Sequence, residues 1–313
     1  MARGTAPRRW TSADVPDQRG RTVVITGANS GIGFEAARVF AQRGATVVLA
    51  CRNPERAADA ERRITAAAPT AKVTTRQLDL ASLASVRRAA ESLRADHPRI
   101  DLLINNAGGI RLRHDITEDG SELTLATNHL GPFAFTGLLL DRLLTTPGSR
   151  IVTVSSIGHR QGSINFADLH FQRRYHAFAA YFQAKLANLM FTYELQRRLA
   201  KAGAPTIAVA AHPGNASTEF GREFPAPVRL LMSPRLGLLN SWLVQSPRMG
   251  ALPTLRAATD PDARGGHYYG PPGWAQFTGH PTRVESSARS HDAGAQRRLW
   301  RESEQLTEVT YPV

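Results

Sequence analysis

A tyrosine and a lysine stand four residues apart in the segment Tyr181-Phe182-Gln183-Ala184-Lys185. The surrounding residues predict a helix, and positions i and i+4 of a helix lie on one face. An ammonium group beside a phenol favours the phenolate, which would lower the pKa of the phenol from about 10 toward neutrality. The pair could therefore act as a tunable proton donor. Taken alone, it would also fit a surface lysine packed over a buried tyrosine on an amphipathic helix.

A second segment could bind a phosphate-bearing cofactor. It begins with a β-branched run at 21–26, passes through Gly27-Ala28-Asn29-Ser30-Gly31-Ile32-Gly33, and continues as a helical pattern that ends at Gly44. The β-branched run predicts a buried strand. Glycines let the next turn approach a pyrophosphate, which free N–H groups and the positive end of a helix would stabilise. This strand, turn and helix context favours a dinucleotide site over an ordinary glycine-rich turn.

Alternating strand and helix patterns continue to about residue 212 and predict an α/β fold. We expect a doubly wound parallel sheet with helices on both faces, built as a single domain with inserted loops. Strands are expected at 21–26, 45–50, 73–80, from residue 100, at 150–156 and at 267–270. Residues 1–20 predict a flexible basic leader, residues 21–280 the domain, and residues 281–313 a C-terminal tail that is helical.

Four motifs occur in order along the chain: Thr26-Gly27-x-x-x-Gly31-x-Gly33, Asn105-Asn106-Ala107-Gly108, Tyr181-x-x-x-Lys185 and His212-Pro213-Gly214. They resemble, in matching order, the motifs of the short-chain dehydrogenase/reductase family, over roughly residues 20 to 280. The segment Cys51-Arg52-Asn53 and the long gap before the tyrosine are similar to the retinol-dehydrogenase-like members. The resemblance implies a Rossmann-like fold, a nicotinamide cofactor, and hydride transfer between that cofactor and a carbonyl or alcohol.

The resemblance also implies roles for individual residues. Catalysis would fall to Ser156, Tyr181 and Lys185, while Asn128 would hold a water near the lysine. Ser155 is a neighbour that could be mistaken for Ser156. The implied contacts of the cofactor are Gly27, Asn29, Ser30, Gly31, Ile32, Gly33, Arg52, Asn53, Asp79, Leu80, Asn106, Ala107, Gly108, Tyr181, Lys185, Pro213, Gly214 and Thr218.

Several of these residues have plainer explanations. Asp79 could contact the adenine amino group or cap the next helix, and both could hold. Asn106 could brace the central strands or only form a turn. Asn128 could pair with the backbone of its own helix, and Ser156 could be a turn former at a strand end. Residues 131 and 132 are Gly and Pro, which permits a helix break nearby.

Residue 52 bears on the choice of cofactor. The second expected strand ends where the adenosine ribose would lie, and an NAD site usually has a carboxylate there. This chain has Cys51 and then Arg52, whose guanidinium suits a 2′-phosphate. The sequence therefore favours NADP over NAD, with an ordinary solvated arginine as the alternative.

The irregular stretches at 157–180 and 215–246 are expected to border the substrate, the second as a lid. The apolar residues of the second stretch favour a small hydrophobic carbonyl or alcohol substrate. Packing on the core explains them equally well, and weak contact with a membrane surface is a third reading. Residues 288–304 predict an exposed amphipathic helix capped by Ser287 or Ser290. Its Trp300 would serve a subunit contact in a homo-oligomer or pack in the core.

The composition of the chain narrows the classes of partner and the location that we expect. The net charge of +13 would ordinarily favour nucleic acid, but the arginines are dispersed along the chain, so no specific nucleic-acid role is expected. The leader lacks the apolar run of a signal peptide, and no stretch is long enough to span a membrane. Cys51 is the only cysteine, which excludes an internal disulfide and favours a cytoplasmic location. The histidines lack metal-ligand spacing, so no metal is expected.

Two functional classes remain. The first is an NADP-dependent carbonyl reductase or alcohol dehydrogenase. The second is a catalytically silent regulator of the same fold that senses NADP(H). Such a regulator would be expected to lack the tyrosine, the lysine or the serine, and all three are present. The sequence therefore favours the enzyme.

Overall fold

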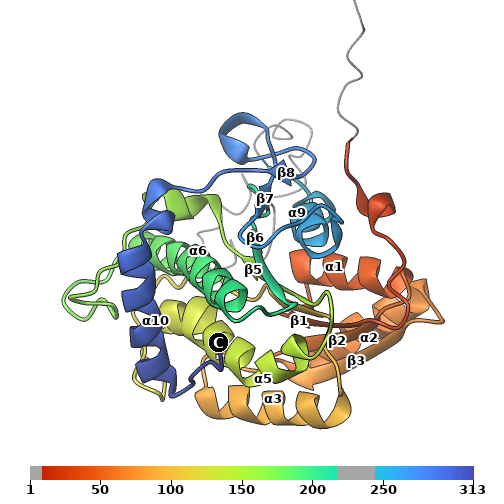
Figure 1. Ribbon diagram of the computed structural model, residues 1–313, viewed down its shortest axis with the longest axis horizontal. Helices are drawn as coiled ribbons and strands as arrows, with labels where there is room; N and C mark the ends of the chain where they lie inside the picture. The colour runs from red at the N-terminus through yellow and green to blue at the C-terminus, as the bar shows by residue number, and fades with distance from the viewer. Residues whose placement is uncertain (1–8, 217–243) are drawn as a thin grey trace, which may run out of the picture.

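One twisted sheet runs through the molecule, with helices packed against both of its faces (Figure 1). The computed structural model describes residues 9–216 and 244–313. Its strands follow the order β3-β2-β1-β4-β5-β6-β7-β8 across the sheet. Their bounds are β1 Thr22–Thr26, β2 Thr46–Cys51, β3 Lys72–Gln77, β4 Leu102–Asn105, β5 Arg150–Val154, β6 Ile207–Ala211, β7 Tyr268–Gly270 and β8 Thr282–Arg283.

The helices divide into two layers. Helices α1, α2 and α9 cover one face, and α3, α5 and α6 cover the other, with α10 packed outside α5 and α6 (Figure 1). The α-helices are α1 Gly31–Gln42, α2 Pro54–Ala67, α3 Leu83–Asp96, α4 Leu123–Leu125, α5 Gly131–Leu144, α6 Ala177–Lys201, α9 Pro247–Thr259 and α10 Ala293–Thr307. A π-helix, η2, spans Ala126–Leu130, and the 3-10 helices are η1 Ser12–Asp14, η3 Ile157–Gln161, η6 Trp274–Gln276 and η7 Ala288–His291. Within the described ranges, no helix combines the length and the apolarity needed to cross a bilayer.

The core explains why the strands read as continuous apolar runs. In β1, Val23 and Ile25 pack into the layer of α1 and α9, whereas Val24 between them packs into the layer of α3 and α5. Successive strand residues point to opposite faces, so a strand covered on both sides must be apolar at every position. All three side chains are fully buried.

The strand order reverses beside β1. From β1 the chain moves outward through β2 and β3, and then returns to place β4 on the other side of β1. The carboxyl ends of β1 and β4 therefore diverge into connections on opposite faces, which leaves a crevice at this point. The predicted doubly wound parallel sheet is confirmed. One difference is β8, a two-residue strand that pairs antiparallel with β7 and is too short to leave a sequence pattern.

The C-terminal helix differs in detail from its prediction. Neither Ser287 nor Ser290 caps α10, because Ser287 precedes the separate turn η7 and Ser290 lies within it. The cap is Asp292, whose carboxylate accepts a hydrogen bond from the Ala295 N–H at 2.9 Å. Of the two roles considered for Trp300, the structure shows core packing: the side chain is 2% exposed.

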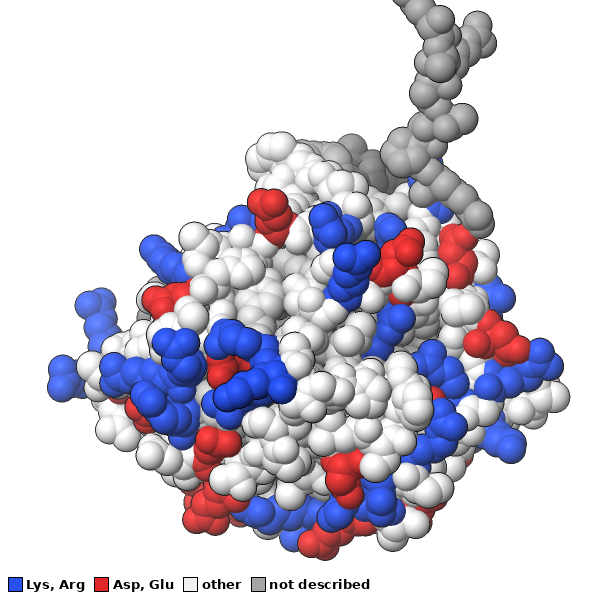
Figure 2. Space-filling view, viewed as in Figure 1, with Lys and Arg blue, Asp and Glu red and all other residues white. Residues whose placement is uncertain are grey.

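Charged side chains lie almost entirely on the surface. On the face shown in Figure 2, Lys and Arg are interspersed with Asp and Glu. Ion pairs such as Arg94 with Asp141, at 2.9 Å, join the two kinds. Both members of that pair are well exposed, so water screens the attraction.

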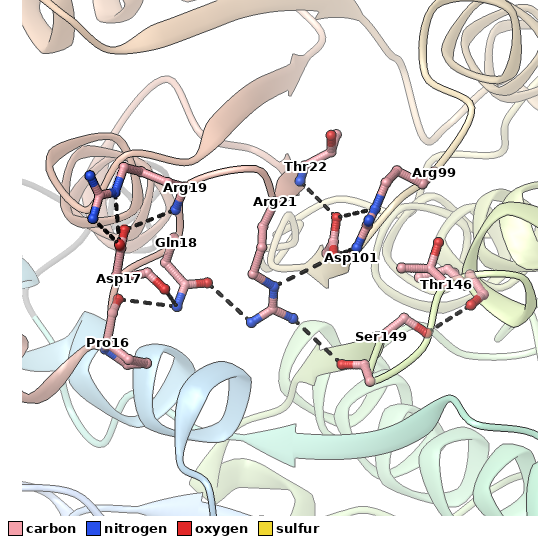
Figure 3. Close-up of polar contacts among 12 residues, drawn as sticks. Pro16, Asp17, Gln18, Arg19, Arg21, Thr22, Arg99, Asp101, Thr146 and Ser149 are labelled. Carbon is pink, nitrogen blue, oxygen red and sulfur yellow. Dashed lines mark hydrogen bonds and ion pairs between the residues drawn. The ribbon is translucent and has the colours of Figure 1, made fainter.

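Asp101 is one of the few exceptions, a carboxylate with 2% exposure at the amino end of β4. It accepts a hydrogen bond from the Thr22 backbone N–H at 2.9 Å and from the Arg99 guanidinium at 2.6 Å, and Arg21 lies 3.6 Å away (Figure 3). Arg21 also reaches the Gly148 carbonyl. These contacts join the amino ends of β1, β4 and β5, and they compensate a charge removed from water.

We expect Asp101→Asn to lower the free energy of unfolding by about 2 kcal/mol, because the amide keeps the shape but leaves the two guanidinium groups without their buried partner. Urea denaturation of both proteins measures the difference. Asp59→Asn is the matched control, since its pair with Arg62 is exposed and should contribute about 0.5 kcal/mol or less. Equal losses in the two variants would contradict this role of Asp101.

Candidate active site

A cavity of about 1010 Å³ opens at the carboxyl ends of the parallel strands. Its walls come from the loops after β1 to β6, so it lies at the reversal of strand order, where ligands bind in open α/β sheets. Every predicted site residue within the described ranges lines it except Asn128. Asn128 lies just behind the wall, against the backbone of Gly109. Thr218 lies outside the described residues, as does most of the predicted lid at 215–246.

The glycine-rich turn after β1 forms a cradle on one side of the cavity. Gly27 and Gly31 have φ values of 67° and 56°, the left-handed region that favours glycine. A Cβ at Gly33 would lie 2.5 Å from the Asn106 side-chain nitrogen, so that position admits no side chain. Ser30 precedes α1 without a capping hydrogen bond from its side chain, which leaves the first N–H groups of α1 for an anion.

Asn106 and Gly108 shape the floor of the cavity after β4. The Asn106 side chain donates a hydrogen bond to the Thr26 carbonyl at 2.9 Å, so it braces β4 against β1 in addition to ending a strand. A Cβ at Gly108 would lie 3.1 Å from Lys185 Nζ and would overlap Asn128 Oδ1. The bare backbone of Gly108 therefore lets the lysine and the asparagine meet there.

Helix α6 brings Tyr181 and Lys185 to the cavity. Both side chains are largely buried, with 7% and 4% exposure. The Lys185 ammonium lies 5.7 Å from the centre of the Tyr181 ring and donates a hydrogen bond to the Val154 carbonyl at 3.1 Å. The i and i+4 spacing thus places both groups on the face of α6 that packs against the end of β5.

The two serines after β5 have different surroundings. The Ser155 hydroxyl donates to the Lys185 carbonyl at 2.7 Å, which ties it to the backbone of α6. The Ser156 hydroxyl hydrogen-bonds Tyr181 and accepts from the Gly158 N–H at 3.1 Å. Of these two hydroxyls, that of Ser156 lies with the Tyr181 phenol, and that of Ser155 is held by the backbone of α6.

Burial governs the protonation of this group. It raises the pKa of Tyr181 to about 12, against a smaller lowering by the Ser156 hydrogen bond. It also lowers the pKa of Lys185 to about 8. The expectation that Lys185 lowers the pKa of Tyr181 toward neutrality is wrong for the polypeptide by itself. The Lys185 ammonium donates its hydrogen bond to the Val154 carbonyl instead, and the desolvation of the phenolate outweighs its attraction.

Asn128 lies in the π-helix η2 between α4 and α5. Its amide donates to the Thr124 carbonyl at 2.8 Å and to the Gly109 carbonyl at 2.9 Å, and its oxygen accepts from the Gly109 N–H at 3.1 Å. The pairing with its own helix is therefore present, and the side chain also reaches the strand-end loop beside Lys185. The wide π turn, a feature frequent at functional sites, provides the room for this double role.

One end of the cavity is formed by the residues after β2 and β3. Arg52 and Asn53 are exposed there, and Asn53 caps α2 by accepting from the Arg56 N–H at 2.8 Å. Arg56 lines the cavity as well. This position of Arg56 was not predicted from the sequence, although the residue stands four positions after Arg52. Asp79 does not cap α3; Ser82 does, and Asp79 instead accepts from the Ala81 N–H at 3.0 Å.

A second missed wall is the loop 271–279. Ala275 and Gln276 have φ values of 48° and 59°, which is strained for residues with side chains. The Phe277 carbonyl accepts from the Asn215 N–H at 2.8 Å and contacts Gly214 closely, so this loop closes the cavity opposite α6. The run Pro271-Pro272-Gly273 marks a loop in sequence, but nothing there indicates that it returns to β6.

Comparison with known proteins gives the family to which this chain belongs. A family model described as short chain dehydrogenase matches residues 21–228, more than half of the chain. The chain belongs to the short-chain dehydrogenase/reductase family of oxidoreductases and resembles its retinol-dehydrogenase-like members.

Particular relatives span nearly the whole chain. Retinol dehydrogenase 13 of Homo sapiens is 41% identical over 296 residues, covering 94% of this chain and 86% of the human protein. The crystal structure of an uncharacterized protein from Mycobacterium paratuberculosis is 42% identical, with a TM-score of 0.80, and covers 98% of this chain and 100% of that one. A Beutenbergia cavernae structure, described as an NAD(P) dependent gluconate 5-dehydrogenase with bound NADP, is 25% identical with a TM-score of 0.64, covering 81% and 96%.

We expect Lys185 to titrate near pH 8, because its burial disfavours the ammonium. The chain has three lysines, and Lys72 and Lys201 are exposed. NMR of protein labelled with 13C at lysine Cε should therefore show three signals, one with a midpoint near pH 8. That signal should be absent from Lys185→Arg. A midpoint near the ordinary lysine value of about 10.4 would contradict the burial described here.

Proposed function

We propose that the protein is an NADP(H)-dependent oxidoreductase that transfers a hydride between the nicotinamide and a carbonyl or alcohol of a small hydrophobic substrate. One observation carries the proposal: Ser156, Tyr181 and Lys185 meet in the same cavity as the glycine cradle. The cradle fits a dinucleotide, since Gly33 admits no side chain and the first N–H groups of α1 have no capping from Ser30. The bound nicotinamide would supply or accept the hydride.

Tyr181 would supply the proton. Its raised pKa keeps the phenol protonated at neutral pH, and Ser156 is hydrogen-bonded to it. A substrate carbonyl oxygen could then accept hydrogen bonds from both hydroxyls, and the phenol proton would pass to the oxygen as negative charge develops there. Oxidation of an alcohol would require the phenolate, which burial disfavours.

Lys185 would hold the cofactor and supply positive charge. Below its pKa of about 8 it is an ammonium, placed between the Val154 carbonyl and the edge of Gly108. From there it could hydrogen-bond the nicotinamide ribose and favour loss of the Tyr181 proton. Asn128, on the other side of Gly108, would hold a water that links the lysine to solvent for reprotonation.

The walls near Tyr181 favour a hydrophobic substrate. Phe178 and Phe182 extend from α6, with ring centres 6.0 Å apart, and Phe277 faces the cavity from the loop after β7. Ile110 completes this apolar lining. Because several relatives are retinol dehydrogenases, a retinoid-like aldehyde is the first substrate to try.

The expected test uses NADPH with a panel of aldehydes and ketones that ranges from short and polar to long and apolar. The parent should reduce the apolar aldehydes best. Tyr181→Phe removes only the hydroxyl and should lower kcat by about a thousandfold, which lies within the roughly 10²–10⁴-fold that general acid catalysis contributes. Consumption of NADPH by Tyr181→Phe at the parental rate would contradict the proposal.

NADP is the preferred cofactor in this proposal because Arg52 and Arg56 line the ribose edge together. The Beutenbergia cavernae protein, which holds NADP on the same fold, supports the choice. A guanidinium can donate paired hydrogen bonds to a 2′-phosphate, and each charge-assisted bond contributes about 1.5–3 kcal/mol.

Arg52→Asp should therefore weaken NADPH binding by tenfold or more relative to NADH, as measured by quenching of tryptophan fluorescence. Arg88→Asp is the matched control, because Arg88 is exposed on α3, away from the cavity, and the change in net charge is the same. Equal weakening of NADPH and NADH by Arg52→Asp would remove the argument for a 2′-phosphate contact.

A further inference from the structure

Behind the proposed active site, buried polar side chains link the C-terminal helix to Lys185. The π-helix η2 presents two adjacent polar residues in different directions. Asn128 contacts the Gly109 backbone at the cavity. His129 instead contacts α10, where its Nε2 atom lies 2.9 Å from the Ser303 hydroxyl oxygen. One short turn is therefore held from both sides.

The hydrogen bonding assigns the state of His129. Ser303 donates its only hydroxyl proton to the Leu299 carbonyl at 2.8 Å. Its oxygen must therefore accept from the imidazole, which places the proton of His129 on Nε2. The side chain is 2% exposed, and burial lowers the pKa of His129 to about 4. The imidazole is consequently neutral at pH 7 and leaves Nδ1 as a buried acceptor.

Lys185 shares its acceptor with Asn188, which lies on the same helix. Within the described residues, Nδ1 of His129 has no hydrogen-bond partner, so His129 is connected to the site through the backbone of η2, which it shares with Asn128. Asn188 donates to the Val154 carbonyl at 3.3 Å. The same oxygen accepts from Lys185 Nζ at 3.1 Å. Lysine and asparagine thus share one acceptor at the end of β5.

Helix α10 is docked independently of Ser303. Trp300, with 2% exposure, packs edge-on against Phe133, with ring centres 5.1 Å apart, and stacks on Phe191 at 5.9 Å. The Tyr311 hydroxyl donates to the Phe133 carbonyl at 2.6 Å. These contacts bury far more surface than one hydroxyl, so loss of the Ser303 hydroxyl should leave the helix in place.

We propose that Ser303 and His129 are positioning residues for the reaction, through which α10 holds the turn that carries Asn128, whose side chain packs beside Gly108 and Lys185. A lysine side chain has four rotatable bonds, so its ammonium stays in one place only if the groups packed around it do. The inference rests on the proposed function, because it assigns Lys185 and Asn128 their part in proton transfer. It adds Ser303 on α10 and His129 on η2, neither of which lines the cavity, to the residues that set the rate.

The test compares Ser303→Ala with Thr307→Val. Thr307 is a matched control: its hydroxyl is buried on the same helix and donates to the backbone of that helix, at 2.7 Å. We expect Ser303→Ala to lower kcat about tenfold with KM for the carbonyl substrate within twofold. The NMR midpoint of Lys185 should rise by at least half a pH unit, because a looser site admits water. Thr307→Val should leave both values unchanged, with a similar shift of Tm.

A second pair of variants addresses His129 itself. His129→Gln keeps an N–H near the position of Nε2, whereas His129→Leu removes it. The glutamine variant should retain several times the kcat of the leucine variant, and its Lys185 midpoint should lie closer to that of the parent. The positioning role would be overturned if kcat and the Lys185 midpoint were the same in Ser303→Ala as in Thr307→Val, and the same in His129→Gln as in His129→Leu.

The outcomes separate this inference from the proposed function. If Tyr181→Phe is inactive while Ser303→Ala matches Thr307→Val in kcat and in the Lys185 midpoint, only the positioning role fails. If Tyr181→Phe retains parental activity, the proposed function fails. The Lys185 midpoint needs no turnover, so it still decides whether α10 controls the environment of the lysine.

Discussion

A buried ammonium group is the constraint on which the arrangement of the site depends. Lys185 is 4% exposed, and a charge removed from water is tolerated only when polar groups replace the lost hydration. The Val154 carbonyl, at the end of β5, does this by accepting from the ammonium at 3.1 Å. The same burial that weakens the ammonium also protonates the neighbouring phenol, so the two groups are tuned in opposite directions by one dry environment.

The other elements of the fold place the backbone of the cavity walls around Lys185. Gly108 must be bare because Asn128 and Lys185 occupy the space of its side chain. The reversal of strand order beside β1 opens the crevice, and the glycine turn after β1 closes one side of it. Rigid packing of α6 against β5 and β6 then places the phenol over the opening. In such a structure, small changes well behind the cavity reach the site, because packed elements transmit shifts.

Much of this could be predicted from local pattern. The β-branched runs, the glycine turn and the i and i+4 pair each depend on residues close in sequence, so the strands, the cradle and the helix face follow from them. The left-handed glycines at 27 and 31 are a clear case, since local geometry alone requires them. The positions of Arg56 and of the loop 271–279 in the cavity wall were not predicted, because they depend on how elements distant in sequence pack together.

The sequence by itself determined the class of fold and the set of residues able to do the chemistry, because strand and helix periodicity and motif spacing are local properties. Only the tertiary structure decided how those residues are ionised and what holds them. Burial reversed the expected effect on Tyr181, and His129 and Ser303 met across 174 positions of chain. Desolvation and contacts between remote elements depend on the packed interior, which no local pattern of residues describes.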